Sequence, residues 1–335
     1  MKPKKRIALI GGAGFIGHNL ALSLKQRGHE PIIIDSLAVN NMLSIADSEI
    51  KNRKLYWSIL NQRMDLLHEQ SIEINVEDAR NYNAMSIMVG QYEPDVIIHL
   101  AAVSHANKSN KDPHNTFDHS LRTLENTLDI SRSLKSHVIY FSSSMVYGHF
   151  DGKEVNEETP CNPLGIYGTL KYSGELIVKA YHQVFGIPYT IIRPSALYGE
   201  RCVSRRVSQI FIENAVQGLD ITINGDGSDK LDFTYIDDFV QGVSLVVENE
   251  KVLNETFNLT YGEARTIGDM VEILRDYFEG IQINYQLKDN LTPDRGTLSI
   301  DKARDLLGYK PQNPIDIGYP KYIQWYRTFW DSMKK

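Results

Sequence analysis

Tyr167 and Lys171 are the two side chains whose types and spacing most directly suggest chemistry. In a helix, residues four apart lie on one face about one turn apart, so the phenol and the ammonium would be neighbours. A free phenol has a pKa of about 10, and nearby positive charge favours the phenolate. Tyr167 is therefore a candidate general base toward a hydroxyl group. Most Tyr-x-x-x-Lys sequences are solvated helix faces, so the surroundings must decide whether this one is a site.

A run of serines supplies those surroundings. Ser142, Ser143 and Ser144 follow the apolar run Val138–Phe141, and Ser143 lies 24 residues before Tyr167. A hydroxyl at a strand end can donate a hydrogen bond to an oxygen that gains negative charge during a reaction. We expect Ser143 to have that role, and we expect Ser142 and Ser144 to cap backbone groups.

A glycine motif near the N-terminus predicts a phosphate site. Gly-x-x-Gly-x-x-Gly at 11–17 directly follows the apolar run Ile7–Ile10. A turn of this kind opens a helix whose first N–H groups and dipole attract an anion. We expect the pyrophosphate of a dinucleotide to be bound by Gly11, Gly14, Phe15, Ile16 and Gly17.

An acidic residue indicates which dinucleotide is bound. Asp35 ends the apolar run Ile32–Ile34 and lies 24 residues after Gly11. A carboxylate at this place accepts hydrogen bonds from the adenosine ribose hydroxyls and repels a 2′-phosphate. The sequence therefore favours NAD over NADP.

The elements that must position these groups follow a regular alternation. Short runs rich in Ile and Val are typical of strands buried on both faces of a parallel sheet, and they occur at Ile7–Ile10, Ile32–Ile34, Val96–Leu100, Val138–Phe141 and Tyr189–Ile192. The stretches between them include Phe117–Leu134 and Tyr167–Phe185, which have apolar residues at helical spacing. This alternation predicts an α/β fold with a doubly wound parallel sheet of the Rossmann type.

The regular alternation of strand and helix patterns ends after Arg193, where shorter patterns of both kinds begin. We predict an NAD-binding Rossmann domain at 1–193 and, at 194–335, mainly a smaller C-terminal substrate-binding lobe that also contributes later strands of the sheet. The stretch Val39–Ser71 is long for a connection between strands and carries scattered apolar residues. It predicts an additional helical hairpin or lid.

Composition excludes several classes of protein. The chain has 335 residues, 42% of them hydrophobic and 23% charged, as in an ordinary globular protein. The net charge of −6 argues against nucleic acid as a partner. Cys161 and Cys202 have no metal-ligand spacing, so we expect no metal site and no disulfide, as suits the cytoplasm. No secretory signal core and no 18-residue apolar stretch are present, so no membrane association is expected.

These motifs together resemble the extended short-chain dehydrogenase/reductase family, which includes the NAD-dependent nucleotide-sugar epimerases and dehydratases. The resemblance runs from about Arg6 to Tyr309. It includes Ser-Ser-x-x-Val-Tyr-Gly around Ser143 and the Tyr167/Lys171 pair. It implies that Asp78 and Ala79 meet the adenine, and that further cofactor contacts come from Leu100, Ala101, Ala102, Tyr167, Lys171, Arg193 and Pro194.

The resemblance also implies a reaction. Tyr167 would be the acid and base, Ser143 would orient the reacting oxygen, and Lys171 would tune the phenol and hold the nicotinamide ribose. Dehydratases and decarboxylases of the family carry an acid just after the catalytic Ser or Thr, whereas this chain has Ser144 and Met145. A nucleotide-sugar 4-epimerase is therefore the first hypothesis. A C4 dehydrogenase that releases the keto sugar is the alternative; a dehydratase, a decarboxylase or a non-catalytic NAD-binding regulator is less favoured.

The substrate contacts depart from the family pattern. Its Asn before Val-Tyr-Gly is Ala196 here, its phosphate-gripping Arg is Leu231, and its Asn on the helix after strand four is His119. Arg205 and Arg206 either face the site or are solvated. The candidate contacts to a nucleotide-diphosphate sugar are Ser143, Ser144, Met145, Tyr167, Ala196, Arg201, Arg205, Arg206, Lys230 and Arg295.

Two further expectations concern helices. In the family, the pair corresponding to Phe117–Leu134 and Tyr167–Phe185 forms a four-helix interface, so a homodimer is expected. Asp237 and Asp238 precede an apolar stretch and are expected to form a helix N-cap rather than a catalytic pair.

Overall fold

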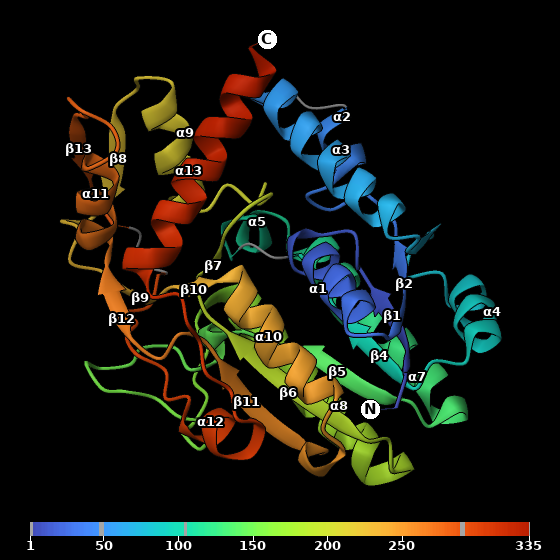
Figure 1. Ribbon diagram of the computed structural model, residues 1–335. Coiled ribbons are helices and arrows are strands. Elements are labelled where there is room, and N and C mark those ends of the chain that lie inside the picture. Colours follow the sequence, from blue (N-terminus) through green and yellow to red (C-terminus); the bar gives the residue numbers. More distant parts are fainter. Residues whose placement is uncertain (1–2, 47–49, 104–105, 289–291, 335) are drawn as a thin grey trace.

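The computed structural model describes residues 3–46, 50–103, 106–288 and 292–334 (Figure 1). Its centre is a seven-stranded parallel sheet in the order β11-β6-β5-β4-β1-β2-β3. The strands are β1 (Arg6–Ile10), β2 (Glu30–Asp35), β3 (Glu73–Val76), β4 (Val96–His99), β5 (His137–Phe141), β6 (Tyr189–Pro194) and β11 (Glu255–Leu259). All five predicted apolar runs are strands of this sheet, so the predicted fold class is confirmed.

Helices cover both faces of the sheet because alternate strand residues point to opposite sides. Ile7 and Leu9 belong to the core beneath α1 (Phe15–Gln26) and α10 (Ile236–Val247). Ala8 and Ile10 belong to a second core, beneath α4 (Tyr82–Tyr92) and α7 (Thr123–Leu134). Next to α7 lies α8 (Gly165–Phe185), which carries the Tyr167/Lys171 pair.

Smaller elements gather beyond the carboxyl ends of the strands (Figure 1). They comprise three two-stranded sheets: β7 (Leu197–Tyr198) with β10 (Thr234–Tyr235), β9 (Lys230–Asp232) with β12 (Ala264–Thr266), and β8 (Ile221–Asn224) with β13 (Ile283–Gln286). The helices α9 (Val207–Val216), α11 (Ile267–Arg275) and α13 (Ile315–Met333) pack against one another there, while α12 (Asp301–Leu307) packs on β11. The boundary predicted after residue 193 falls inside β6, and β11 returns to the large sheet.

The stretch 39–71 contains two helices, α2 (Met42–Ala46) and α3 (Arg53–Glu69). Positions 47–49 of this stretch lie outside the described residues. Helix α3 is tied to the later part of the chain: the hydroxyls of Tyr56 and of Tyr326 in α13 each donate to the Glu213 carboxylate, both at 2.6 Å. Figure 1 shows α3 lying beside the C-terminal end of α13. The prediction of helices is confirmed, and the lid role stays a prediction.

Two local expectations need correction. The stretch predicted as one helix at 117–134 is interrupted: α6 (Pro113–Phe117) leads into a π-helical turn at Asp118–Arg122 before α7 begins. The N-cap prediction for Asp237 and Asp238 is wrong because α10 begins at Ile236 and both acids lie within its first turn. The Asp238 carboxylate instead accepts backbone N–H bonds from residues 312 and 313, both at 2.8 Å, and so holds the segment before α13. Across the described part of the chain, no helix is long and apolar enough to cross a membrane.

Candidate active site

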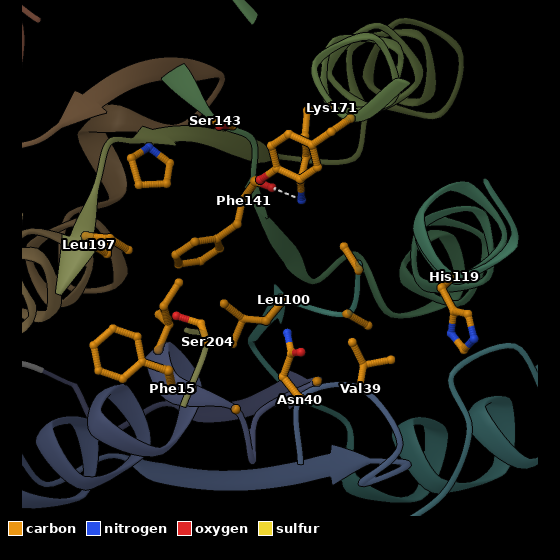
Figure 2. Close-up of a pocket in the computed structure, with 18 of the residues that line it drawn as sticks. Phe15, Val39, Asn40, Leu100, His119, Phe141, Ser143, Lys171, Leu197 and Ser204 are labelled. Atoms are coloured by element: carbon orange, nitrogen blue, oxygen red, sulfur yellow. Dashed lines mark hydrogen bonds between the residues drawn. The ribbon is translucent and has the colours of Figure 1, made fainter. Parts of the chain in front are cut away.

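A cavity of about 420 Å³ opens at the carboxyl ends of the central strands, within the usual size range of ligand sites. In Figure 2, Ser143 and Lys171 lie at one end of this cavity, and Phe15, Val39 and Asn40 lie at the opposite end. The predicted site residues that line it are Gly11, Gly14, Phe15, Ile16, Gly17, Asp35, Asp78, Ala79, Leu100, Ala101, Ala102, Ser143, Ser144, Met145, Tyr167, Lys171, Pro194, Ala196, Arg206 and Arg295.

The glycine turn has the geometry that a phosphate site requires. Gly11 has a φ of +78°, and a Cβ there would lie 2.7 Å from the backbone nitrogen of Ala101. A Cβ at Gly17 would collide with the carbonyl of Gly12, so only glycine allows α1 to pack this closely on its own turn. Gly14 is the N-cap of α1 and offers no side-chain cap, which leaves the first N–H groups of the helix for an anion. These residues fit a pyrophosphate.

Asp35 is oriented by its own backbone surroundings. Its Oδ2 accepts the N–H of Ala13 at 2.9 Å and its Oδ1 accepts the N–H of Leu37 at 2.7 Å. Burial raises the pKa of the Asp35 carboxyl, and these two hydrogen bonds oppose the rise. Further lone pairs on the two oxygens stay available for ribose hydroxyls.

Asp78, a predicted adenine contact, is held in place by an ion pair with Arg80. Arg80 pairs with Asp78 at 2.6 Å and with Asp118 at 2.8 Å, which fixes the loop after β3 against the π-helical turn. The next residue, His119, also lines the cavity, and its side chain lies in a different part of the cavity from Lys171 (Figure 2). Burial and Arg80 lower the pKa of His119, so its imidazole is neutral near pH 7.

The three predicted catalytic residues line the same cavity. Lys171 is 7% exposed, and its Nζ donates to the carbonyl oxygen of Phe141 at 2.7 Å (Figure 2). Burial lowers the pKa of Lys171 to about 8. The Oγ of Ser143 accepts the N–H of Met145 at 3.2 Å, which leaves the Ser143 hydroxyl hydrogen for a ligand. Tyr167 is partly buried on the first turns of α8.

Two residues at this end of the cavity have partners that the sequence did not predict. Ser142 does not cap backbone, because its hydroxyl donates to the Glu175 carboxylate of α8. Arg193 does not line the cavity: its guanidinium makes a buried ion pair with Glu175 at 2.7 Å and donates to the Tyr147 hydroxyl at 2.9 Å. A buried guanidinium needs such a partner, and through this ion pair Arg193 joins β6 to α8. Its contact with the cofactor stays a prediction.

The basic residues predicted to bind substrate divide into two groups. Arg206 and Arg295 line the cavity. Arg201, Arg205 and Lys230 do not, which does not support their predicted role. The guanidinium of Arg201 lies against α1, where it donates to the Asn19 side chain at 3.1 Å, whereas Arg205 and Lys230 are exposed.

The structure also shows where two residues that depart from the family pattern lie. Ala196 lines the cavity with a φ of +37°, a backbone region that costs an alanine more than an asparagine or a glycine. Leu231 packs against the hydrophobic core.

Sequence reasoning missed several lining residues, notably Arg63, Asn110, Ser195 and Ser204. The polar residues at 110, 195 and 204 carry no recognisable pattern. Arg63 does carry a signal, because it occupies a core position of α3 between Ile59 and Leu67, each four residues away. A charge within such a stripe is unusual and marks a special environment.

A phosphate-binding turn, an acid at the end of β2 and a Ser, Tyr and Lys set at the far end of one cavity define a dinucleotide-dependent enzyme of the short-chain dehydrogenase/reductase class. The model of the NAD dependent epimerase/dehydratase family matches residues 7–260, and the chain belongs to this family. It is an NAD-dependent enzyme, as predicted.

Relatives within this family differ in the reactions named for them. The chain is 30% identical to YtcB of Bacillus subtilis, described as an uncharacterized UDP-glucose epimerase, over 98% of this chain and 99% of that protein. It is 26% identical to a dTDP-glucose 4,6-dehydratase of Streptomyces antibioticus, over 98% and 95% of the two chains. The crystal structure of UDP-glucuronic acid 4-epimerase from Bacillus cereus, in complex with UDP-glucuronic acid and NAD, superposes with a TM-score of 0.85 at 26% identity and covers 96% and 99% of the two chains.

Proposed function

We propose that the protein is a nucleotide-sugar 4-epimerase. The observation that carries the proposal is the pair of side chains after the catalytic serine: Ser144 and Met145 both line the cavity, and neither can act as the acid that water elimination needs. Chemistry confined to C4 requires from the protein only the serine, the tyrosine and the lysine, with NAD as the hydride acceptor. Several relatives, including the solved UDP-glucuronic acid enzyme, are named as 4-epimerases.

The proposed roles use side chains that line one cavity. Tyr167 takes the proton of the C4 hydroxyl and later returns it, and Ser143 donates a hydrogen bond to the same oxygen. Lys171 supplies a positive charge at the same end of the cavity, and its ammonium is oriented by a hydrogen bond to the carbonyl oxygen of Phe141. Bound NAD supplies the hydride acceptor and donor. The ketone must turn over in the cavity between the two transfers, so that both faces of C4 are presented to the same cofactor.

Two arginines are suited to the diphosphate of the substrate. Arg295 and Arg206 line the cavity, and the Nε of Arg295 has no hydrogen-bond partner among the residues that the structure describes. Burial, together with the charge of Arg206, lowers the pKa of Arg295 to about 10. An anion placed beside both guanidinium groups would relieve this unfavourable arrangement.

The test is a panel of UDP-, GDP- and dTDP-sugars, with products identified by the NMR signals of the sugar ring. An epimer of equal mass with no net NADH supports the proposal. A released 4-keto sugar with accumulating NADH favours the dehydrogenase alternative, loss of water favours a dehydratase, and loss of carbon dioxide favours a decarboxylase. Failure of every sugar to react would favour the NAD-binding regulator.

Variants at the catalytic end test the assignment of roles. Tyr167→Phe keeps the ring and removes the ionisable group, so turnover should fall by at least about 100-fold while NAD binding survives. Tyr172→Phe on the same helix is the matched control and should react at a near-normal rate. A Tyr167→Phe protein that reduces bound NAD at the parent rate would contradict the assignment.

A homodimer is also part of the proposal. On α8, Leu176 and Val184 are 51% and 71% exposed, and at the end of α6 Phe117 is 57% exposed. Apolar side chains this exposed on neighbouring helices suit a two-fold interface. Light scattering should give twice the mass of the 38.1 kDa chain, and a monomer mass at micromolar concentration would contradict the dimer.

A further inference from the structure

Arg63 is a buried cation that the proposed reaction does not use. It lies on α3, within the additional helices between β2 and β3, and its side chain is 0% exposed. Its neighbours on the same helix face, Ile59 and Leu67, are equally buried. A guanidinium in such a position is costly unless a partner offsets the loss of water.

The partners that the protein supplies are incomplete. Both Nε and Nη2 donate to one backbone oxygen, the carbonyl of Arg201, at 2.9 Å for Nε. Within the described ranges, Nη1 has no hydrogen-bond partner and no carboxylate forms an ion pair with Arg63. The nearby guanidinium of Arg201 adds a like charge, and burial is the main reason that the pKa of Arg63 falls to about 10. At neutral pH the group is still charged. The Asp35 carboxylate attracts this charge through space, but it forms no direct ion pair with Arg63.

The position of Arg63 indicates which anion it would bind. Arg63 lines the cavity together with Phe15 and Ile16 of the α1 N-terminus and with Asp35. The α1 N-terminus is where the two negative charges of the NAD pyrophosphate are expected. Asp35 is already engaged with the backbone N–H groups of residues 13 and 37.

We propose that Arg63 binds the pyrophosphate of the dinucleotide through its free Nη1, so that the helices inserted between β2 and β3 form part of the cofactor site. Through the carbonyl of Arg201, the same side chain also holds the segment that carries Ser204 and Arg206 of the cavity. The proposal goes beyond the 4-epimerase reaction and does not depend on it, because any enzyme that holds NAD here would use the contact.

Titration calorimetry of the full chain with NAD, ADP, adenosine and 2′-AMP tests the proposal. Arg63→Gln should weaken NAD and ADP by about 10- to 100-fold, the worth of a hydrogen bond to a charged group. Adenosine lacks the pyrophosphate and should bind the variant as it binds the parent. The affinity of ADP should also depend less on salt in the variant, since one cation has been removed.

A matched control separates binding from structural damage. Glu213→Gln weakens the other anchor of α3, the tie to Tyr56 and Tyr326, and leaves Arg63 in place. This control should lower the melting temperature while the ADP affinity stays within about twofold of the parent, a free-energy change below about 0.5 kcal/mol. Arg63→Lys keeps the positive charge but lacks the several N–H donors of a guanidinium. It should therefore lose less ADP affinity than Arg63→Gln.

Several results would overturn the proposal. Equal ADP affinity in the parent and Arg63→Gln proteins would show that Nη1 meets no phosphate. A matching loss of adenosine affinity, or the same loss in Glu213→Gln, would show that α3 acts only as a support. A larger loss for 2′-AMP than for ADP would place Arg63 at the ribose. None of these titrations involves a sugar, so their outcome is independent of whether the protein proves to be an epimerase.

Discussion

Replacement of Lys171 by methionine should stabilise the nucleotide-free protein while it abolishes function. Lys171 is 7% exposed, and its ammonium donates only to the carbonyl of Phe141 among the hydrogen bonds of the described residues. Burial lowers its pKa from the ordinary 10.5 to about 8, and the negative charge of Glu175 only partly opposes the change. The protein therefore holds a charged group that its surroundings disfavour, as catalytic sites commonly do.

The magnitude follows from the pKa. The difference between 10.5 and about 8 corresponds to about 3 kcal/mol of folding free energy at pH 7. Methionine has a similar length and no charge, but it leaves the Phe141 carbonyl without a donor, which costs about 1 kcal/mol. The net expectation is that Lys171→Met raises the free energy of unfolding by about 2 kcal/mol at pH 7.

The pH dependence gives a sharper test. The folded-state pKa lies below the unfolded-state pKa, so between pH 8 and 10.5 the unfolded chain binds more protons and the parent gains stability as the pH rises. The destabilisation by Lys171 is full below about pH 8 and disappears above about pH 10.5. Between pH 7 and pH 9 the advantage of Lys171→Met should shrink by about 1 kcal/mol.

Urea unfolding of both proteins at the two pH values measures this difference. Lys179→Met, a lysine replacement on the same helix, is the control for the loss of one positive charge. If Lys171→Met is less stable than the parent at pH 7, or if its advantage is the same at pH 9, the reasoning from the buried ammonium is refuted.

Three further predictions concern other parts of the site. Glu175→Gln should lower the free energy of unfolding by about 3 to 5 kcal/mol, because Arg193 would keep its buried charge without a carboxylate; a loss below about 1 kcal/mol in chemical denaturation would speak against this account. Ala196→Gly should raise stability by up to about 1 kcal/mol, because the φ of +37° suits glycine; thermal unfolding checks it, and a lower melting temperature would contradict the strain. NAD should bind more tightly than NADP by about 1 to 3 kcal/mol because Asp35 repels a 2′-phosphate, and equal affinities in calorimetry would disprove this.

The strands and the phosphate turn could be predicted because their signals are local. A run such as Ile7–Ile10 is apolar on both faces, which is typical of a strand in a parallel sheet whichever strands lie beside it. Gly17 is required by its contact with Gly12 inside one strand–turn–helix unit, whereas the space at Gly11 is limited by the backbone of Ala101 after β4. The positive φ of Gly11 is a property of the turn itself, so the glycine spacing still identifies the turn. The interruption of the helix at Asp118–Arg122 was harder to predict, because Phe117 continues the apolar spacing of the helix that follows. The π-helical turn comes between them, and Phe117 is exposed while Leu124 is buried.

The partners and positions of the arginine side chains could not be predicted in the same way. Arg193, Arg201 and Arg295 have the same side chain, yet one is neutralised by Glu175, one lies against α1 and one lines the cavity. A long cationic side chain reaches many places, and the partner that it finds depends on which distant segments the fold brings within a few ångströms.

By itself, the sequence determined the parallel sheet, the dinucleotide turn, the acid at Asp35 and the Tyr167/Lys171 pair, because each depends on residues a few positions apart in one element. Only the tertiary structure decided that Arg63, 28 residues beyond Asp35 in the chain, lies on the same cavity and that one of its nitrogens has no partner among the described residues. The physical reason is the range of the forces concerned. Backbone preferences and apolar periodicity act along a segment, whereas the cost of a buried charge depends on every group that packing places around it.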